Sequence, residues 1–224
     1  SEEHIATMEC PVLSPEACAA ERLGIVTGAD ATPSELPAWA ACEAADAAVS
    51  GRLSVGVDLS PSGVVTVGVA SVVDGTVTVE LAGVAAGVAA GDDPSTVAVQ
   101  ALSRLVREHG GRVWVDPRSE AAALIPALTA AGIEVVSIRS SDLAAACVLL
   151  RRLVEERRLR HRGQPPLDAA AAGAVVRPVG ESWVWGRRRS SVDIAPLVAV
   201  TLAAWGAMSS QSRSVYEDEG LVMV

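Results

Sequence analysis

Apolar and polar positions alternate from residue 53 onward, which predicts a series of β-strands. The first stretch, 53–59, ends at a turn rich in serine, proline and glycine. Two further stretches, 64–73 and 76–81, flank the dipeptide Asp74-Gly75, which is the strongest short-range signal for a hairpin. Three consecutive antiparallel strands are therefore expected.

Beyond these strands the apolar period lengthens, and helices are expected to alternate with single strands. Helices at 95–109 and 119–131 each close at glycine, and short strands follow them at 112–116 and 133–138. Strand, helix and strand at this spacing imply a right-handed parallel crossover. The prediction is an α/β fold with a mixed five-stranded sheet, in which three antiparallel strands precede parallel ones and helices flank the sheet.

The last third of the chain is expected to be mostly helical. One long helix is predicted from Ser141 to about Arg160, and a small alanine-rich helix from Leu167. The segment 183–186 is typical of one arm of a small extra hairpin, whose return arm would begin with the three arginines that follow. A final apolar helix is expected to run to about Met208, before an acidic tail.

Residues 1–50 differ from the rest in being acidic and rich in alanine and proline. Short helices are expected at 14–24 and around 38–48. We interpret residues 1–50 as a connector and residues 51–224 as the folded domain.

Composition excludes several classes of function. All 18 basic residues are arginine, and the absence of lysine rules out a Walker-type phosphate loop and Schiff-base chemistry. The four cysteines show no CxxC spacing, so neither zinc nor a disulfide framework is indicated. The longest apolar run, 194–208, is too short to cross a bilayer, and no signal peptide is visible. We therefore expect neither a membrane protein nor a secreted one.

The net charge of −9 argues against indiscriminate binding of polyanions. The charge is unevenly spread, however. Residues 151–189 contain ten arginines and four acids, a local net charge of +6, which is a plausible footprint for a polyanion.

Three acids stand at positions where they can meet. Asp58 lies in the first strand on a face shared with Ser54 and Gly56, which should leave room around its carboxylate. Asp116 ends the fourth strand, and Asp193 begins the last helix. If the fourth strand is parallel to the first and beside it, all three acids can share one edge of the sheet. Each acid also has a local interpretation, as a turn cap, a helix cap or a partner of the helix dipole.

A cluster of carboxylates persists only if cations neutralise it, and hard oxygen ligands select Mg²⁺ or Mn²⁺. Two such ions can activate a water and stabilise both oxygens of a phosphodiester displacement, which is nuclease chemistry. A glycosidase with two carboxylates has no use for a third acid. A serine hydrolase is disfavoured because the sequence lacks a G-x-S-x-G motif.

The order of elements resembles the RNase H superfold. More narrowly, residues 50–222 resemble the nuclease domain of the large terminase subunit of tailed bacteriophages, especially those of high-GC actinobacteria. The resemblance rests on four short motifs in this order: 55–61, 114–117, 160–168 and 183–196.

The resemblance implies that Asp58, Asp116 and Asp193 are catalytic and bind two Mg²⁺ or Mn²⁺ ions. It implies a substrate of double-stranded DNA, cut from a concatemer at the start and end of packaging. The ATPase domain of the same full-length protein, the portal protein and the small terminase subunit are the implied partners. The implied location is the host cytoplasm, and the isolated domain is expected to be monomeric.

Further residues are expected around this predicted centre. Arg187, Arg188 and Arg189 are the best candidates to grip the DNA backbone, with Arg162 beside them. His161 either orients water and contacts phosphate or has a structural role. Asp168 is either a neighbour of the metal site or, as we favour, a partner of Arg160 or Arg162. Trp183 and Trp185 are expected to pack the hairpin rather than stack on bases.

Two other functions stay open on the sequence alone. One is a resolvase-like nuclease of the RNase H fold that cuts branched DNA. The other is a catalytically silent module that docks on the portal, the small terminase subunit or the ATPase.

Overall fold

Six strands form one mixed sheet at the centre of the protein. The computed structural model describes residues 35–60, 62–82 and 94–218. The strand order is β5-β4-β1-β2-β3-β6; β1 pairs antiparallel with β2, and β2 with β3, whereas the remaining pairs are parallel. The strands are β1 (Ser54–Leu59), β2 (Val65–Val73), β3 (Thr76–Leu81), β4 (Val113–Val115), β5 (Val135–Ser137) and β6 (Leu159–Arg160).

The predicted meander and parallel crossover are confirmed, but the sheet has a sixth strand that the sequence did not predict. The long helix ends at Glu155 instead of continuing to about Arg160. Arg157 adopts the left-handed conformation with φ of 55°, which stops the helix. The chain then turns so that the fully buried Leu159 pairs with Val77 of β3.

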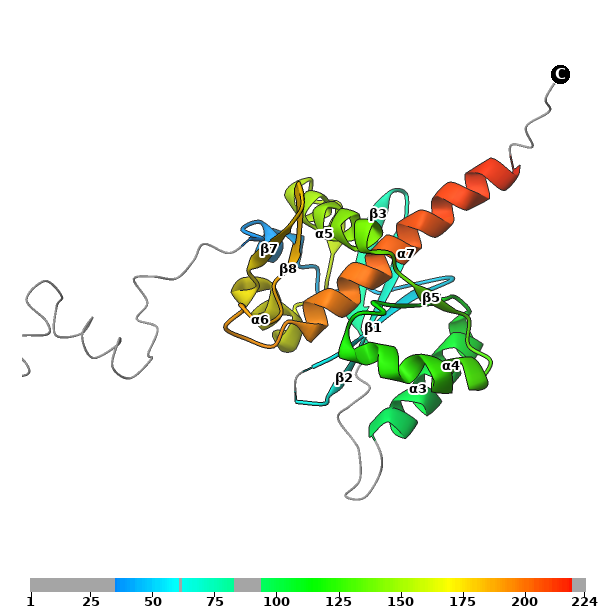
Figure 1. Ribbon diagram of the computed structural model, residues 1–224. Helices are drawn as coiled ribbons and strands as arrows, with labels where there is room; N and C mark the ends of the chain where they lie inside the picture. The colour runs from blue at the N-terminus through cyan, green and yellow to red at the C-terminus, as the bar shows by residue number, and fades with distance from the viewer. Residues whose placement is uncertain (1–34, 61, 83–93, 219–224) are drawn as a thin grey trace, which may run out of the picture. The chain divides into compact units, whose positions relative to one another are not determined.

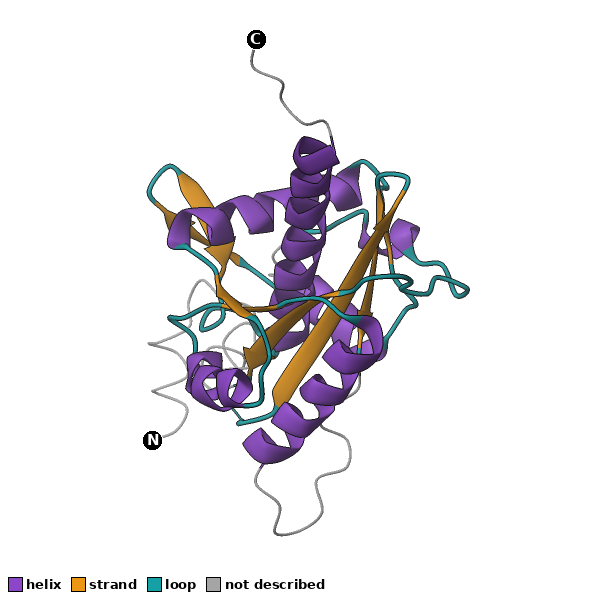
Figure 2. Ribbon diagram, turned by 90° about the vertical axis from the view of Figure 1, so that its right-hand side faces the viewer, coloured by secondary structure: helices purple, strands orange, loops and turns teal. Residues whose placement is uncertain are grey.

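Helices cover both faces of the sheet (Figures 1 and 2). One face packs against α3 and α4 through an apolar core that includes Val55, Val57 and Leu102. The other face packs against α7, with α5 and α6 in the same core. The helices are η1 (Trp39–Cys42), α3 (Pro94–His109), η2 (Glu120–Leu124), α4 (Ile125–Ala130), α5 (Ser140–Glu155), α6 (Pro165–Gly173) and α7 (Ala195–Asp218).

The small hairpin exists, but its arms differ from the prediction. The arm at β8 (Ser182–Trp185) pairs with β7 (Val176–Val179), which precedes it, and not with the arginines that follow it. Trp185 donates a hydrogen bond to Thr201 Oγ1 of α7 at 3.0 Å, and Arg151 of α5 lies over the ring of Trp183 at 4.4 Å. The two tryptophans therefore pack the hairpin against α5 and α7, as predicted.

The last helix is longer than predicted. It continues to Asp218 because no proline or glycine interrupts residues 207–218. The expected acidic tail thus begins inside a helix, and its end lies outside the described residues. No helix in the described part of the chain combines the length and apolar character needed to span a bilayer.

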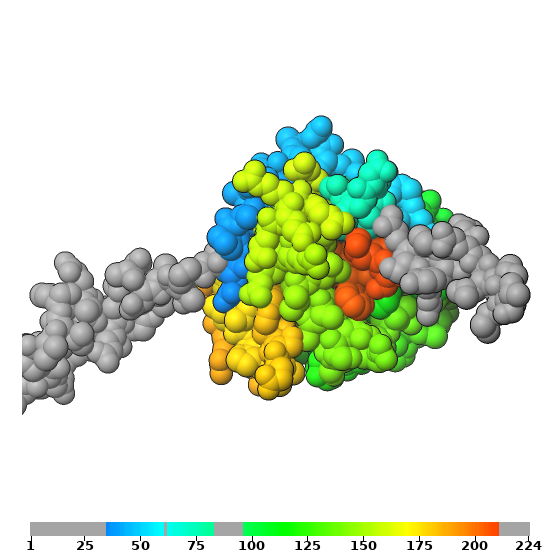
Figure 3. Space-filling view, turned by 90° about the horizontal axis from the view of Figure 1, so that it is seen from above, coloured from blue at the N-terminus to red at the C-terminus, as the bar shows by residue number. Residues whose placement is uncertain are grey.

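The described part of the N-terminal segment, 35–50, packs on the same core. The expected helix around 38–48 is only the short η1, because Glu43 turns to extended backbone and bridges to His161. Leu36, Trp39 and Cys42 are buried, and Figure 3 shows this segment in blue beside α5. The helix expected at 14–24 lies outside the described residues, and the interpretation of 1–50 as a connector stays a prediction.

Helix α7 lies directly on the backbone of β1 and β2. A Cβ atom built on Gly56 would lie 2.1 Å from the carbonyl oxygen of Ala199, and one on Gly68 would lie 2.7 Å from Ala199 and Val200 backbone atoms. The face of β1 that carries Gly56 was expected to be roomy around Asp58. At Gly56 that expectation was wrong, because α7 fills the face there and helps to bury Asp58. Asp58 itself nevertheless lines a cavity.

Replacing Gly56 with alanine should therefore destabilise the protein by at least about 3 kcal/mol, because the new methyl group meets backbone atoms that cannot move independently. The measurement is urea unfolding followed by circular dichroism. Gly132→Ala is the matched control. A Cβ there meets nothing within 4 Å, so only its left-handed backbone, at φ of 78°, is penalised, by about 1 kcal/mol. Equal losses in the two variants would contradict the close approach of α7.

Candidate active site

Two acids lie side by side at one edge of the sheet. Asp58 is near the end of β1, and Asp116 directly follows β4. These strands are parallel neighbours, with Val57 in register with Val115, so the next residue of each strand is an acid. The predicted placement of the two acids on neighbouring parallel strands is confirmed. Asp58 is 1% exposed and Asp116 6% exposed.

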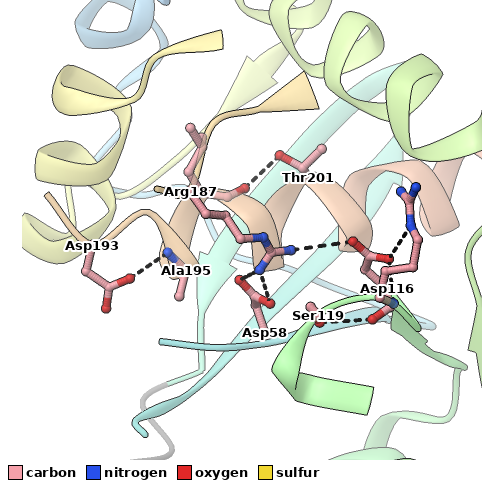
Figure 4. Close-up of polar contacts among 9 residues, drawn as sticks. Asp58, Asp116, Ser119, Arg187, Asp193, Ala195 and Thr201 are labelled. Carbon is pink, nitrogen blue, oxygen red and sulfur yellow. Dashed lines mark hydrogen bonds and ion pairs between the residues drawn. The ribbon is translucent and has the colours of Figure 1, made fainter. Parts of the chain in front are cut away.

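Arg187 bridges the two acids. Its Nη1 atom donates to both carboxylate oxygens of Asp58, and its Nη2 atom lies 3.8 Å from Oδ2 of Asp116 (Figure 4). The side chain reaches the acids from the turn after β8, 129 residues away from Asp58 along the chain. One guanidinium group thus balances part of the charge of two buried carboxylates.

Asp116 is also held by its own turn. Its Oδ1 atom accepts a hydrogen bond from the backbone N–H of Arg118 at 3.0 Å, and the Arg118 side chain lies 3.5 Å from the same oxygen. Ser119 Oγ donates to the backbone carbonyl of Asp116 at 2.9 Å. The local turn therefore fixes Oδ1, whereas Oδ2 faces Arg187.

Asp193 lies at the start of α7. Its Oδ1 atom accepts a hydrogen bond from the backbone N–H of Ala195 at 2.9 Å, so this carboxylate caps the helix. The side chain is exposed, and it lines the same cavity as Asp58 and Asp116. Over the ranges that the structure describes, however, no three carboxylate, imidazole or thiol side chains come close enough to hold one ion. A joint ligand set of three acids stays a prediction.

The cavity over these acids is large and rimmed by arginine. Its volume is about 970 Å³. The three arginines expected to grip DNA line it, and so do two that the sequence reasoning missed, Arg118 and Arg177. Arg118 follows Asp116 by two residues, a signal that was available in the sequence. Arg177 is on β7, and only the true pairing of the hairpin places it here.

The carboxyl group of Asp58 is electrostatically perturbed. Burial raises its pKa from 3.8 to about 6, although Arg187 opposes this shift and the nearby Asp116 adds slightly to it. Cys147 lines the same cavity, and burial raises the pKa of its thiol to about 12, so it stays neutral. The acid at the centre of the site is therefore easier to protonate than an exposed aspartate.

His161 does not reach the cavity. It is 1% exposed, its ring stacks on Trp39 with centroids 4.3 Å apart, and its Nε2 atom lies 3.0 Å from the Trp39 carbonyl oxygen. The buried ring contacts Trp39 and does not reach the cavity, which favours the structural role of His161 over contact with phosphate. Arg162 pairs with Glu80 of β3 at 3.2 Å and does not line the cavity either.

The expected pairing of Asp168 with an arginine was wrong. Its Oδ1 atom accepts a hydrogen bond from Trp39 Nε1 at 2.8 Å and lies 3.6 Å from His161 Nδ1. The sequence reasoning missed Trp39 because it lies 129 residues before Asp168 in a segment that was interpreted as a connector. This cluster attaches the segment 35–50 to the folded unit.

The raised pKa of Asp58 predicts a specific pH dependence of stability. Between pH 4 and 6 the folded protein holds a proton more tightly than the unfolded chain, so the free energy of unfolding should fall as pH rises, by about 2 kcal/mol. Urea unfolding in EDTA between pH 4 and 6.5 measures this fall. Asp58→Asn should lack it. Asp142→Asn, at a partly exposed acid whose pKa is lowered mainly by its hydrogen bond with Arg139, should retain it. Parallel curves for the wild type and Asp58→Asn would exclude Asp58 as the titrating group.

Comparisons with known proteins show the fold. Neither a protein-family model nor a curated protein sequence matches this chain. Among solved structures, the large terminase of bacteriophage HK97 aligns with a TM-score of 0.62 at 18% identity, over 75% of this chain and 42% of that one. The large terminase nuclease of the thermophilic phage G20c aligns with a TM-score of 0.57 at 14% identity, over 77% and 97%.

The G20c nuclease with bound magnesium also aligns, with a TM-score of 0.56 at 15% identity, over 78% of this chain and 97% of that one. This chain thus spans less than half of the HK97 protein and nearly the whole of the G20c nuclease. The predicted RNase H-like arrangement, a mixed sheet between helices with a separate hairpin, is confirmed. The chain has the fold of the nuclease domain of phage large terminases.

Proposed function

We propose that this chain is the nuclease domain of a phage large terminase subunit and cuts concatemeric double-stranded DNA during packaging. The observation that carries the proposal is the pair of buried carboxylates, Asp58 and Asp116, at the base of an arginine-rimmed cavity in this fold. A pair of buried acids is costly for a folded protein unless cations balance its charge, and perturbed acids in a cleft are typical of functional sites.

The residues present suit divalent ions. Asp58 and Asp116 are hard oxygen donors at one sheet edge, and a positive group, the guanidinium of Arg187, already lies between them. Asp193 lines the same cavity, and we propose it as the third metal ligand. The G20c nuclease has been crystallised with magnesium and with cobalt. We propose Mg²⁺ or Mn²⁺, as two ions, for this chain.

When bound, such ions supply an activated water and stabilise the attacking and leaving oxygens of the phosphodiester. The protein's own residues position the reactants. Asp58 and Asp116 are fixed by buried strands and by a turn, so their oxygens need little reorganisation. Arg188 and Arg189 are exposed on the rim of the cavity and would bind backbone phosphates.

We propose the other parts of the packaging machinery from the same similarity of fold. An ATPase domain of the same protein, with the segment 1–50 as the connector to it, would drive DNA into the procapsid. The portal protein and the small terminase subunit are the proposed partners. The site of action would be the host cytoplasm, and the isolated domain would be monomeric.

Cleavage by the purified chain is the direct test. Plasmid DNA should be cut in Mn²⁺ or Mg²⁺ and not in EDTA, and Asn at Asp58, Asp116 or Asp193 should each lower the rate by at least about 100-fold. Asp142→Asn, at an acid of α5 that is not among the residues lining the cavity, should cut at the wild-type rate.

The outcomes separate the alternative functions. Retained cleavage in one variant would remove that acid from the site. A strong preference for a four-way junction over linear duplex would favour a resolvase-like enzyme. DNA binding without cleavage at millimolar Mn²⁺ would favour a silent docking module.

The arginine rim should govern DNA binding independently of cleavage. In EDTA, the double variant Arg188→Ala, Arg189→Ala should bind duplex DNA more weakly whatever its sequence, and the slope of log K against log salt should fall by about 2. Fluorescence anisotropy over a range of salt concentrations measures both quantities. Arg104→Ala is the control, because this exposed arginine pairs with Glu108 on α3 and does not line the cavity. An unchanged slope in the double variant would exclude the rim as the phosphate contact.

A further inference from the structure

Arg187 behaves differently from the two arginines that follow it. Its side chain is 30% exposed and points inward at Asp58 and Asp116. Arg188 and Arg189, in contrast, are exposed residues of the rim. The N–H groups of Arg187 that would bind a phosphate are therefore already directed at carboxylates, and DNA contact does not explain this position.

The charge balance of the site explains the inward position of the Arg187 side chain better. Asp58 is 1% exposed, and an unpaired carboxylate at that depth is strongly destabilising. A guanidinium can meet two carboxylates at once because its donors lie in a planar fork. Both carboxylate oxygens of Asp58 accept hydrogen bonds from Arg187. The oxygen atoms that would coordinate a metal ion are therefore already occupied by a cation of the protein itself.

The backbone around Arg187 is fixed, but its side chain has room to move. The Gly186 N–H donates to the carbonyl oxygen of Val175 at 2.7 Å, and the Gly186 carbonyl oxygen accepts from the N–H of Arg189 at 2.9 Å and from Ser190 Oγ at 3.0 Å. The cavity of about 970 Å³ lies over the guanidinium. A change of side-chain rotamer would move the Arg187 guanidinium away from Asp58 and from Oδ2 of Asp116.

We propose that Arg187 is a built-in counter-cation that competes with divalent ions for Asp58 and Asp116. It holds the two acids together in the metal-free protein and withdraws into the cavity when an ion binds. This inference rests on the proposed function, since it assumes that these acids are metal ligands. It assigns Arg187 a positioning role at the metal site, instead of the phosphate-binding role that its neighbours have.

The test is binding of Mn²⁺ to the DNA-free protein at pH 7.5, with free Mn²⁺ counted by electron paramagnetic resonance. Arg187→Gln should bind Mn²⁺ about tenfold more tightly than the wild type, because no charge-assisted hydrogen bonds to Asp58 have to be broken. Arg104→Gln removes the same charge from an exposed arginine that pairs with Glu108 on α3 and does not line the cavity, and its Kd should stay within about twofold. Arg187→Lys keeps the charge but lacks the planar fork of N–H donors, so its Kd for Mn²⁺ should lie between those of the wild type and Arg187→Gln.

A second measurement excludes a merely structural role. In EDTA, Arg187→Gln should melt at a lower temperature than the wild type, and saturating Mn²⁺ should close this gap because the ion replaces the lost cation. A gap that persists unchanged in Mn²⁺, or a Kd for Arg187→Gln equal to or weaker than that of the wild type, would overturn the proposal.

The controls distinguish failure of the competition from failure of the metal site. If Mn²⁺ binds to the wild type, is lost in Asp58→Asn and is unaffected by Arg187→Gln, only the competition fails and the metal site stands. If no variant binds Mn²⁺ at millimolar concentration, the metal site and the competition fail together.

Discussion

The contact of α7 with β1 and β2 is the constraint on which the rest of the structure depends. Gly56 and Gly68 have no side chains, and this allows the helix backbone around Ala199 to lie against the strands. The same helix begins beside Asp193 and anchors the hairpin through Thr201 and Trp185. Because one helix is pressed onto the sheet, the acid at its start and the arginine of the hairpin are both brought over the end of β1.

Burial of Asp58 follows from this packing and sets the electrostatics of the site. The carboxylate is covered because the glycine face of β1 is filled, and desolvation then raises its pKa to about 6 even with a guanidinium beside it. The packing of α7 on β1 is thus a physical cause of the raised pKa of Asp58. The protein has to provide a cation for the acid, and the hairpin that α7 holds in place supplies Arg187.

Much of the architecture could be predicted because its signals are local. Alternation and the Asp74-Gly75 turn defined the meander, and parallel pairing of β4 with β1 then implied that Asp58 and Asp116 are neighbours. The failures share a different cause. Periodicity shows which residues share a face but not what covers it, so the glycine face was misjudged. The contacts of Arg187 with Asp58 and of Trp39 with Asp168 each join positions 129 residues apart, and no local pattern encodes such a pairing.

Net charge is a poor guide to what this surface can bind. The whole chain carries −9, yet five arginines and four acids line the cavity. Charges more than about 8–10 Å from a bound phosphate are largely screened at physiological salt, so this local set decides the outcome. A phosphate that approaches Asp58 and Asp116 meets two carboxylates, the guanidinium of Arg187 shared between them and the Arg118 side chain beside Asp116. Under the proposed function, divalent ions would add the positive charge at the base of the cavity that lets DNA lie close to these acids.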